Sequence, residues 1–310
     1  METIKYEYGK KPKLSPSVLA LGFFDGVTLA HRELLKEARK IADKKGLSLG
    51  VFTFYSTDPI KPLSERIYST EDKLLLLGRC GVDFVILSSF DELSGLSPEE
   101  FVRIISEDLG ASVAVSGFNF RFGKGARGNV ADLKSLMKKG GGSAVTVKEQ
   151  TLDGKSISAT LIRELISLDK IEEANRLLGA PYMLRGLVSS GKGLGHSLGF
   201  PTVNTDIPSG RATPLGVYRS AVPIGDRIYH AVTNIGSCPT MGERKTHAET
   251  HIIDYNGDLY SKDIEVYLLG YLRDEIRFNT PEELIAQVEE DKKRAIKENG
   301  ELTCQKLGLK

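Results

Sequence analysis

Cysteine is scarce in this sequence, and long apolar runs are absent. The three cysteines among 310 residues, Cys80, Cys238 and Cys304, lie far apart and lack the spacing of metal ligands. They are expected to be unpaired thiols in a reducing compartment. The segment METIKYEYGKKPKLSP lacks the apolar core of a secretory signal, and no run approaches the roughly 18 apolar residues of a membrane span. The sequence therefore predicts a cytoplasmic protein that does not enter a membrane.

An excess of charge of either sign is also absent. Lysine and arginine total 42 and the acidic residues total 41, so the formal net charge is +1. This balance lacks the broad basic surface that binds nucleic acid or anionic membranes, and any phosphate binding must be local. Hydrophobic residues at 40% and charged residues at 27% are typical of a folded protein, and the length favours two domains. These features give no sign of an obligate protein partner.

Short apolar runs alternate with helical patterns from residue 17 to residue 179. The apolar runs are SVLALG, LSLGVFTF, VDFVIL and SVAVSG, and they are followed in turn by HRELLKEARKIADKKG, TEDKLLLLGRC, SPEEFVRIISEDLG and VADLKSLMKKG. This alternation predicts an α/β domain with a parallel, doubly wound sheet. Ser97 with Glu100 forms the pattern of a capping box, and Gly46 is placed to end the first helix. The segment SAVTVKEQ completes the sheet, and helical spacing continues over residues 157–179.

The hydrophobic period changes from helical to two after Ala180-Pro181. The segments YMLRGLVSSG, GVYRSAVPIGDRIYHAVTNIG and AETHIIDYNGDLYSKDIEVYLLGYLR are predicted to be paired strands. Gly225-Asp226 and Asn256-Gly257 are predicted hairpin turns, because both pairs tolerate positive φ. The last element, TPEELIAQVEEDKKRAIKENG, is a predicted helix that begins after Thr280. We therefore expect two domains, residues 1–181 and 182–310, of which the second is a small antiparallel β-barrel closed by one helix.

A glycine-rich segment, GKGLGHSLGFPTVNT, spans residues 191–205. Its glycines allow backbone amides to approach phosphate groups closely, and a hydroxyl at Thr202 and an amide at Asn204 could hold a magnesium ion. The segment is not a Walker motif. Taken alone, it is more often a glycine-rich turn between two strands.

One carboxylate of the second domain occupies a strand with chemically useful neighbours. In AETHII, strand alternation places Glu249 and His251 on one face and Ala248 and Ile252 on the other. A carboxylate on such a strand can accept the proton of an alcohol. Taken alone, a strand carboxylate is more often simply exposed to solvent.

These segments occur together, and nearly the whole chain resembles the bacterial bifunctional riboflavin kinase/FMN adenylyltransferases, also called FAD synthetases. LGFPTVN is similar to the family's LGFPTAN phosphate and magnesium loop, and AETHIIDYNGDLY is similar to its catalytic-glutamate strand. GVY and NIGSCPT resemble its flavin-site segments. The resemblance implies a Greek-key kinase barrel in which Glu249 is the general base and Thr202 and Asn204 bind magnesium. It further implies ATP contacts from Gly191, Gly193, Gly195, Pro201, Thr202 and Asn204, and flavin contacts from Gly216, Tyr218, Asn234, Gly236 and Thr240.

The N-terminal domain resembles the adenylyltransferase half of the same family with several departures. LALGFFDGVTLAH is similar to the motif GxFDGVHxGH, whose histidines contact ATP phosphates, but Thr28 replaces the first histidine and Ala30 replaces the glycine. In ISATLIR, similar to ISSTxIR, Ala159 lacks the family's hydroxyl, and TFYSTDP lacks the histidine of TFxPHP. SGFNFRFG resembles GxDFRFG. The resemblance implies ATP contacts from Gly22, Phe23, Asp25, His31, Asn119, Thr160 and Arg163, with His31 also catalytic.

The sequence thus predicts a riboflavin kinase (riboflavin and ATP to FMN and ADP) that is also an FMN adenylyltransferase (FMN and ATP to FAD and pyrophosphate). Magnesium is the expected cofactor, ATP the co-substrate, and riboflavin, FMN and FAD the substrates or products. The departures at Thr28, Ala30 and Ala159 predict slow adenylyl transfer. They leave open a kinase-only enzyme with an inactive or regulatory N-terminal domain. A non-catalytic flavin-binding regulator is disfavoured because Thr202, Asn204 and Glu249 are all present.

Overall fold

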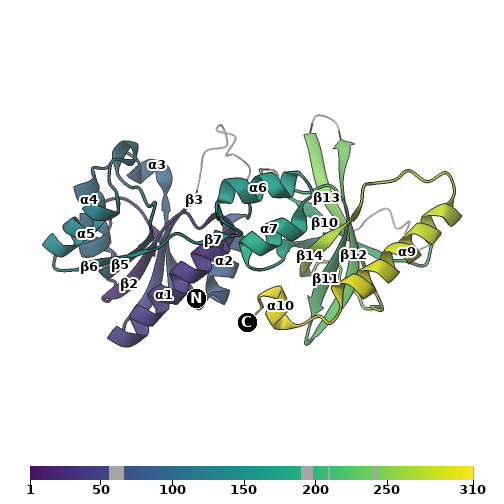
Figure 1. The fold of residues 1–310 in the computed structure, drawn as a ribbon, viewed down its shortest axis with the longest axis horizontal. Helices are drawn as coiled ribbons and strands as arrows, with labels where there is room; N and C mark the ends of the chain where they lie inside the picture. Colours follow the sequence, from purple (N-terminus) through teal and green to yellow (C-terminus); the bar gives the residue numbers. More distant parts are fainter. Residues whose placement is uncertain (56–65, 190–197, 209, 241–242, 310) are drawn as a thin grey trace. The chain divides into compact units, whose positions relative to one another are not determined.

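The computed structural model describes residues 1–55, 66–189, 198–208, 210–240 and 243–309, without the side chains of residues 237–245 (Figure 1). The chain folds into two compact units. Unit 1 comprises Met1–Pro62 and Thr70–Ile157, and unit 2 comprises Leu63–Ser69 and Ser158–Lys310. This division differs from the sequence-based boundary at residue 181, because it places residues 158–181 with the barrel.

Unit 1 contains a six-stranded parallel sheet with the strand order β1-β4-β3-β2-β5-β6. The sequence prediction of a parallel α/β sheet is confirmed. The strands are β1 (Glu2–Tyr6), β2 (Ser17–Leu21), β3 (Ser48–Tyr55), β4 (Phe84–Ser89), β5 (Ala111–Gly117) and β6 (Ser143–Val147). The edge strand β1 was not predicted, because only its last residue, Tyr6, is buried and its sequence ETIKY carries little apolar signal.

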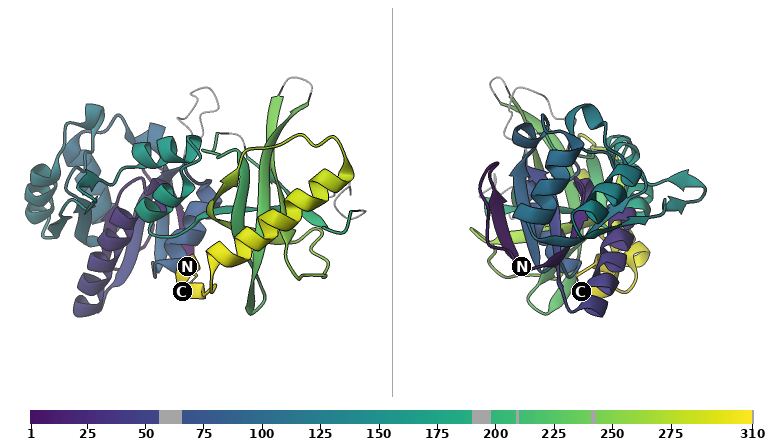
Figure 2. Two further views of the ribbon diagram at one scale, coloured as in Figure 1. Left: turned by 45° about the vertical axis from the view of Figure 1, so that its right-hand side comes forward. Right: turned by 90° about the vertical axis from the view of Figure 1, so that its left-hand side faces the viewer.

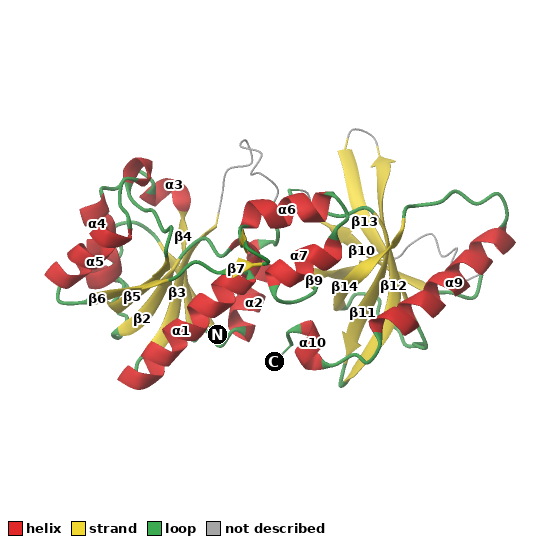
Figure 3. Ribbon diagram, in the orientation of Figure 1, coloured by secondary structure: helices red, strands yellow, loops and turns green. Residues whose placement is uncertain are grey.

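Helices cover both faces of this sheet (Figure 3). They are α1 (Leu29–Lys45), α2 (Thr70–Arg79), α3 (Phe90–Leu93), α4 (Pro98–Arg103) and α5 (Val130–Lys139). Shorter elements are the 3₁₀ turns η1 (Asp25–Val27) and η3 (Lys124–Ala126), the π-helical segment η2 (Ile104–Asp108), and the two-stranded ribbon of β7 (Thr151–Leu152) and β8 (Lys155–Ser156). The predicted capping box at Ser97 and Glu100 and the left-handed cap at Gly46 are both present.

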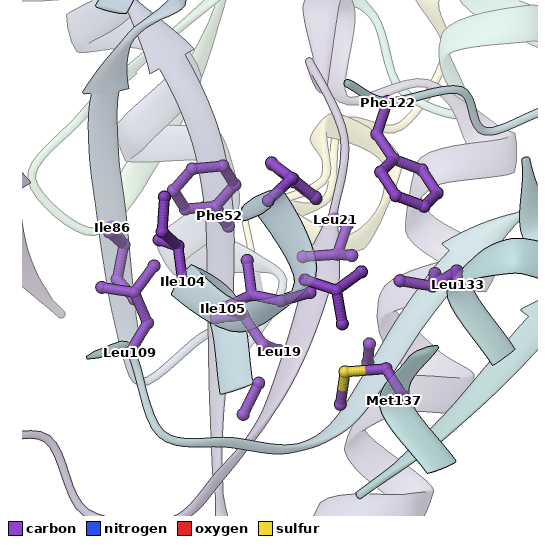
Figure 4. Close-up of a cluster of buried hydrophobic side chains, with 14 of the residues drawn as sticks. Leu19, Leu21, Phe52, Ile86, Ile104, Ile105, Leu109, Phe122, Leu133 and Met137 are labelled. Atoms are coloured by element: carbon purple, nitrogen blue, oxygen red, sulfur yellow. The ribbon is translucent and has the colours of Figure 1, made fainter. Parts of the chain in front are cut away.

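The core of unit 1 lies between the sheet and the helices that follow β4 and β5 (Figure 4). Leu19 and Leu21 of β2 project into it with Phe52, Ile104 and Met137, all at most 2% exposed. The intervening residues of β2 are also buried. A strand buried on both faces reads as a continuous apolar run, and SVLALG shows that pattern.

Unit 2 is a closed six-stranded barrel with the order β10-β13-β12-β11-β14-β9. Three consecutive strands, β11, β12 and β13, are followed by β14, which returns to pair with β11. This spatial order is a Greek key, as expected. The strands are β9 (Tyr182–Ser189), β10 (Thr202–Ile207), β11 (Gly216–Ile224), β12 (Arg227–Thr240), β13 (Glu243–Ile252) and β14 (Asp263–Arg273).

The helices of unit 2 flank this barrel. They are α6 (Ala159–Ser167), α7 (Ile171–Leu178), α9 (Pro281–Asn299) and α10 (Cys304–Leu307). Figure 2 shows α9 crossing the barrel strands obliquely. Its Ala295 packs against Val217, Val232 and Leu272, so α9 closes one side of the barrel as predicted.

One of the two predicted hairpins is wrong. Gly225-Asp226 connects β11 and β12 in a tight hairpin, as expected. Asn256-Gly257 does not make a hairpin, because the flanking strands β13 and β14 do not pair with each other. The connection between them crosses one end of the barrel and buries Ile253 and Leu259 at 5% exposure each. Burial of these two side chains, rather than local turn preference, decides the course of the chain.

Residues 157–179, whose apolar spacing predicted helical structure, form two helices that are separated at Asp169. Asp169 has a left-handed backbone with φ 58°. Its Oδ1 accepts hydrogen bonds from the Leu215 backbone at 2.9 Å and from the Tyr218 hydroxyl at 3.0 Å. Aspartate tolerates this conformation better than most residues, and the two hydrogen bonds hold it there.

A short segment between β3 and α2 belongs to unit 2. Residue Arg66 forms a parallel bridge with Arg211, and the hydroxyl of Tyr182 donates to the carbonyl groups of Ile67 at 3.0 Å and Ala212 at 2.6 Å. The ring of Tyr68 stacks on Tyr182, with centroids 5.3 Å apart. The buried guanidinium of Arg211 lies over both rings.

Candidate active sites

Strand register brings three predicted kinase residues into one row of unit 2. Glu249 of β13 lies opposite Asn204 of β10 and also opposite Asn234 of β12. Directly opposed residues of adjacent strands have side chains on the same face of the sheet. The reverse face carries Ala248 and Thr250, which are fully buried, so the alternation expected from the sequence is present. Glu249 itself is 44% exposed, as a base that must reach a substrate requires.

Thr202 lies two residues before Asn204 on β10, so its side chain is on the same face of the sheet. It is opposite His251, whose Nδ1 is 3.0 Å from the carbonyl oxygen of Pro201. Burial lowers the pKa of His251, which keeps the imidazole neutral near pH 7 and able to donate one hydrogen bond. His251 therefore anchors the backbone that enters β10 just before Thr202. The sequence pattern placed His251 beside Glu249 but indicated no role for it.

The sequence did not reveal Glu275, which contacts two of the predicted flavin residues. The side-chain amide of Asn234 donates to Oε1 of Glu275 at 3.1 Å. A β-carbon added to Gly236 would lie 2.5 Å from the same oxygen, so a larger residue there would require this carboxylate to shift. Oδ1 of Asn234 is buried and has no hydrogen-bond partner among the residues that the structure describes. A buried acceptor of this kind needs a donor from a ligand or water.

Tyr218 and Gly216, also predicted to contact the flavin, are held in place by neighbouring residues of unit 2. Tyr218 is fully buried, and its hydroxyl donates to Leu215 at 2.8 Å and to Asp169. Burial raises the pKa of this phenol, and the negative charge of Asp169 raises it further. Gly216 has φ 112°, and a β-carbon there would lie 2.9 Å from the Arg273 carbonyl oxygen. Flavin contact by these two residues stays a prediction.

Four predicted residues fall outside the part of the chain whose side chains are described. Gly191, Gly193 and Gly195 lie outside the described residues altogether. Thr240 ends β12, but its side chain is likewise outside the described part of the chain. Phosphate binding by the three glycines and flavin binding by Thr240 stay predictions.

In unit 1, the turn that follows β2 carries the predicted nucleotide residues. Gly22 donates its backbone N–H to Phe52 of β3 at 3.2 Å and thereby extends the sheet by one residue. After Phe23 the backbone becomes left-handed at Phe24 (φ 52°), Gly26 (φ 81°) and Val27 (φ 43°). Positive φ is costly for a β-branched residue such as Val27. The turn is therefore strained, and strain of this kind concentrates at functional sites.

His31 and Thr28 cap α1 reciprocally. The backbone N–H of Thr28 donates to Nδ1 of His31 at 3.1 Å, and the backbone N–H of His31 donates to Oγ1 of Thr28 at 3.4 Å. Burial and then the positive charge of Lys73 lower the pKa of His31 to about 4. The imidazole is thus neutral near pH 7. Because Nδ1 accepts a hydrogen bond, the proton resides on Nε2, which can donate to a phosphate oxygen.

Three aromatic rings meet beside this turn, at the carboxyl edge of the sheet. The centroid of Phe23 lies 5.1 Å from that of Phe54 and 5.4 Å from that of Phe90, and Phe54 and Phe90 are 5.5 Å apart. Phe23 is 52% exposed and Phe90 is 43% exposed. Exposed aromatic clusters are unusual on a soluble surface and mark binding sites. Only Phe23 was predicted from the sequence; the available signal was that Phe54 ends one apolar run and Phe90 follows another after two serines.

The remaining predicted ATP residues are divided between the units. Asn119 is exposed in the turn that follows β5, a strand that neighbours β2 in the sheet of unit 1. Thr160 and Arg163 lie in α6 of unit 2, where Nη2 of Arg163 donates to Oγ1 of Thr160 at 3.2 Å. Ser158 caps α6 by accepting from the backbone N–H of Leu161 at 3.2 Å. A hydroxyl thus stands directly before Ala159, the position that departs from the family motif.

Two residues on the same face of β10 fit a magnesium ion. Thr202 and Asn204 offer a hydroxyl and an amide oxygen, which are hard oxygen donors of the kind that this ion accepts. In the described part of the chain, no three His, Cys, Asp or Glu side chains gather as a metal site. A site with few protein ligands suits magnesium, which retains waters and binds substrate phosphates.

Two family models match the chain: riboflavin kinase over residues 178–298 and FAD synthetase over residues 10–161. The bifunctional riboflavin kinase/FMN adenylyltransferase of Bacillus subtilis (strain 168) is 33% identical over 297 residues, covering 93% of this chain and 94% of that protein. The protein of the same name from Escherichia coli (strain K12) is 32% identical over 284 residues, covering 88% of this chain and 90% of that protein. The chain belongs to the bifunctional riboflavin kinase/FMN adenylyltransferase family.

A solved structure matches this chain over most of its length. The crystal structure of a protein described as a macrolide-efflux protein from Streptococcus pneumoniae matches with a TM-score of 0.85 and 30% identity, covering 95% of this chain and 99% of that one. Across the described residues, we find no helix with the length and apolar character needed to cross a membrane.

Proposed function

We propose that unit 2 phosphorylates riboflavin with Glu249 as the general base. The observation that carries this proposal is the row of Asn204, Glu249 and Asn234 across three adjacent strands. Glu249 accepts the proton of the terminal ribityl hydroxyl, the hydroxyl oxygen bonds to the γ-phosphorus of ATP, and the bond from that phosphorus to the β-phosphate oxygen breaks. The products are FMN and ADP.

The surrounding residues position the two substrates. Thr202 and Asn204 hold magnesium, which neutralises charge on the ATP phosphates when it is bound. The unpartnered Oδ1 of Asn234 accepts a hydrogen bond from riboflavin, and Glu275 fixes the amide that presents this oxygen. The exposed carboxylate of Glu249 lies between these two asparagines, so the base stands between the phosphate side and the flavin side of the row.

We further propose that unit 1 transfers the adenylyl group of ATP to FMN. A phosphate oxygen of FMN attacks the α-phosphorus, and pyrophosphate leaves. This reaction needs no protein nucleophile, so the protein acts by positioning its substrates and stabilising charge. The Nε2–H of His31 at the start of α1 donates to a phosphate, assisted by the helix dipole. The aromatic cluster of Phe23, Phe54 and Phe90, whose rings are tilted or edge-to-face, offers an aromatic surface against which the isoalloxazine ring can pack.

A single incubation tests both activities. The pure protein is incubated with riboflavin, ATP and magnesium in a cytoplasm-like buffer, and FMN and FAD are separated by chromatography over time. Early FMN followed by slower FAD supports the proposal. FMN without FAD would favour a kinase whose unit 1 is regulatory or inactive, and flavin binding without turnover would favour a non-catalytic flavin sensor. We propose that the protein acts in the cytoplasm on these small molecules.

A further inference from the structure

The side chain of Lys73 is buried at the carboxyl ends of two neighbouring parallel strands. It is in α2 and is 7% exposed. Its Nζ lies 2.8 Å from the carbonyl oxygen of Phe54, 3.1 Å from Oγ1 of Thr53 and 3.3 Å from the carbonyl oxygen of Phe23. Thr53 and Phe54 belong to β3, whereas Phe23 follows β2. An ammonium group has three N–H donors, and each of these three oxygens can accept a hydrogen bond from it.

The hydroxyl of Thr53 joins the same atoms. It accepts from Lys73 and donates to the carbonyl oxygen of Phe23 at 2.9 Å, and Thr53 is completely buried. The carbonyl of Phe23 thus receives hydrogen bonds from both β3 and α2. Residue 23 is also the point where the chain leaves the sheet and enters the strained turn with positive φ at Phe24 and Val27. A strained backbone persists only where its surroundings fix it.

The far end of the turn is fixed by the reciprocal cap of Thr28 and His31. Asp25 lies between the two fixed points. The charge of Lys73 acts on this end too, because it helps to lower the pKa of His31 and so keeps the Nε2–H donor uncharged. Such deep burial is unusual for a lysine side chain. The ammonium group of Lys73 joins the ends of β2 and β3 where the strained turn after Phe23 begins.

We propose that Lys73 is a positioning residue of the adenylyltransferase site: its ammonium group joins the ends of β2 and β3 and fixes the turn that presents Asp25 and His31 to ATP. The inference rests on the adenylyl transfer proposed above. Lys73 acts through the turn and need not touch ATP. FAD formation therefore depends on Lys73, whereas FMN formation in unit 2 does not.

The test compares Lys73→Met and Thr53→Val with the wild type in the full-length protein. Lys73→Met keeps a side chain close to the length of the lysine stem but removes the ammonium group, and Thr53→Val removes the bridging hydroxyl at nearly constant shape. We expect Lys73→Met to lower kcat of FAD formation by about 10- to 100-fold with a smaller change in KM for ATP, because misplaced catalytic groups mainly affect the reacting complex. Thr53→Val should act in the same direction, by about 3- to 10-fold. FMN formation should stay within about twofold in both variants.

A spectroscopic measurement separates positioning from general damage. Nitrogen-15 NMR of labelled histidine should show the Nε2–H tautomer of His31 in the wild type and a mixture of tautomers or protonated imidazole in Lys73→Met. Lys44→Met, an exposed lysine in the last turn of α1, is the matched control and should change neither reaction.

Each outcome decides the inference. Unchanged FAD formation and an unchanged His31 signal in folded Lys73→Met would overturn it. If circular dichroism shows that Lys73→Met does not fold, Thr53→Val decides, and wild-type FAD formation in that variant overturns the inference. If the wild type itself makes no FAD, adenylyl transfer by unit 1 fails as a proposal, and the His31 signal in Lys73→Met alone then decides whether Lys73 fixes the turn.

Discussion

Thr28 and His31 hold each other at the start of α1, with the Thr28 backbone N–H 3.1 Å from the His31 Nδ1. Thr28 stands where the family motif has a histidine, and its buried hydroxyl has become the helix cap. The departure from the motif is thus built into the local structure. It supplies a cap but removes one imidazole from the phosphate side of the turn.

Restoring the motif with Thr28→His and Ala30→Gly should raise FAD formation by about 10-fold or more and leave FMN formation unchanged. A hydrogen bond to a charged phosphate contributes about 1.5–3 kcal/mol, which sets this scale. The loss of the Thr28 cap should cost about 0.5–2 kcal/mol of stability. Chromatography of FAD and a thermal melt measure the two effects. Unchanged FAD output, or a wild type whose FAD synthesis already keeps pace with its FMN synthesis, would count against this prediction.

Replacing Glu249 by glutamine should lower kcat of FMN formation by about 10²- to 10⁴-fold, because the general base is lost while shape is kept. Riboflavin binding, measured by quenching of flavin fluorescence, should change little. Glu290→Gln, at an exposed position of α9, is a suitable control. Near-normal FMN formation by Glu249→Gln would sink the assignment of the base.

Replacing Thr202 or Asn204 by alanine should raise the magnesium and ATP concentrations needed for half-maximal FMN formation. Both side chains are proposed to hold the metal and phosphates, so riboflavin affinity should be affected less. The measurement is FMN formation titrated separately with magnesium and with ATP. An unchanged requirement for both, or unfolding seen by circular dichroism, would mean that the two side chains serve structure only.

Replacing Gly236 by alanine should weaken riboflavin binding. The added β-carbon would lie 2.5 Å from Oε1 of Glu275, which must move and release the Asn234 amide. Because Glu275 is exposed, its side chain can move at little cost in stability, and the expected effect is a higher KM for riboflavin. Gly95→Ala is the matched control, because a β-carbon there meets nothing within 4 Å. The prediction fails if both variants show the same KM for riboflavin as the wild type.

The depressed pKa of His31 makes unit 1 less stable in acid. The folded pKa is about 4 and the ordinary value is 6.5, so the folded state binds fewer protons than the unfolded state between these values. The folding stability linked to neutral His31 is therefore fully present above pH 6.5 and is lost as the pH falls from 6.5 towards 4. His31→Gln should therefore lose less stability than the wild type between pH 7 and pH 5. Denaturation with urea, followed by circular dichroism at several pH values, measures the difference.

The order of strands and helices was largely predictable, because hydrophobic period and capping patterns are local. Three local features formed as expected: the capping box of Ser97 and Glu100, the helix end at Gly46 and the hairpin turn at Gly225-Asp226. The turn expected at Asn256-Gly257 failed because burial of Ile253 and Leu259 is a tertiary effect. Local turn preference could not reveal which strand β14 would pair with.

Sites were predictable only where residues lie in motifs. The row formed by Asn204, Glu249 and Asn234 requires the pairing of three strands, and the sequence supplied its members but not their adjacency. Glu275 has no motif of its own, so its contact with Asn234 could not be inferred. Lys73 did leave a signal: it shares the buried face of α2 with Leu76 and Leu77 at helical spacing, an unusual place for a lysine.

The segment that carries Ile67 and Tyr68 means that no single cut can separate the two halves of this protein. A fragment beginning at residue 158 would contain Tyr182 and Arg211 but not the carbonyl and ring that cover them. Its exposed cluster would favour aggregation, unless a synthetic peptide of residues 63–69 were added in trans. The two halves of the sequence are therefore interleaved, and insertion or loss of either as one block would leave the barrel without a piece of its own core.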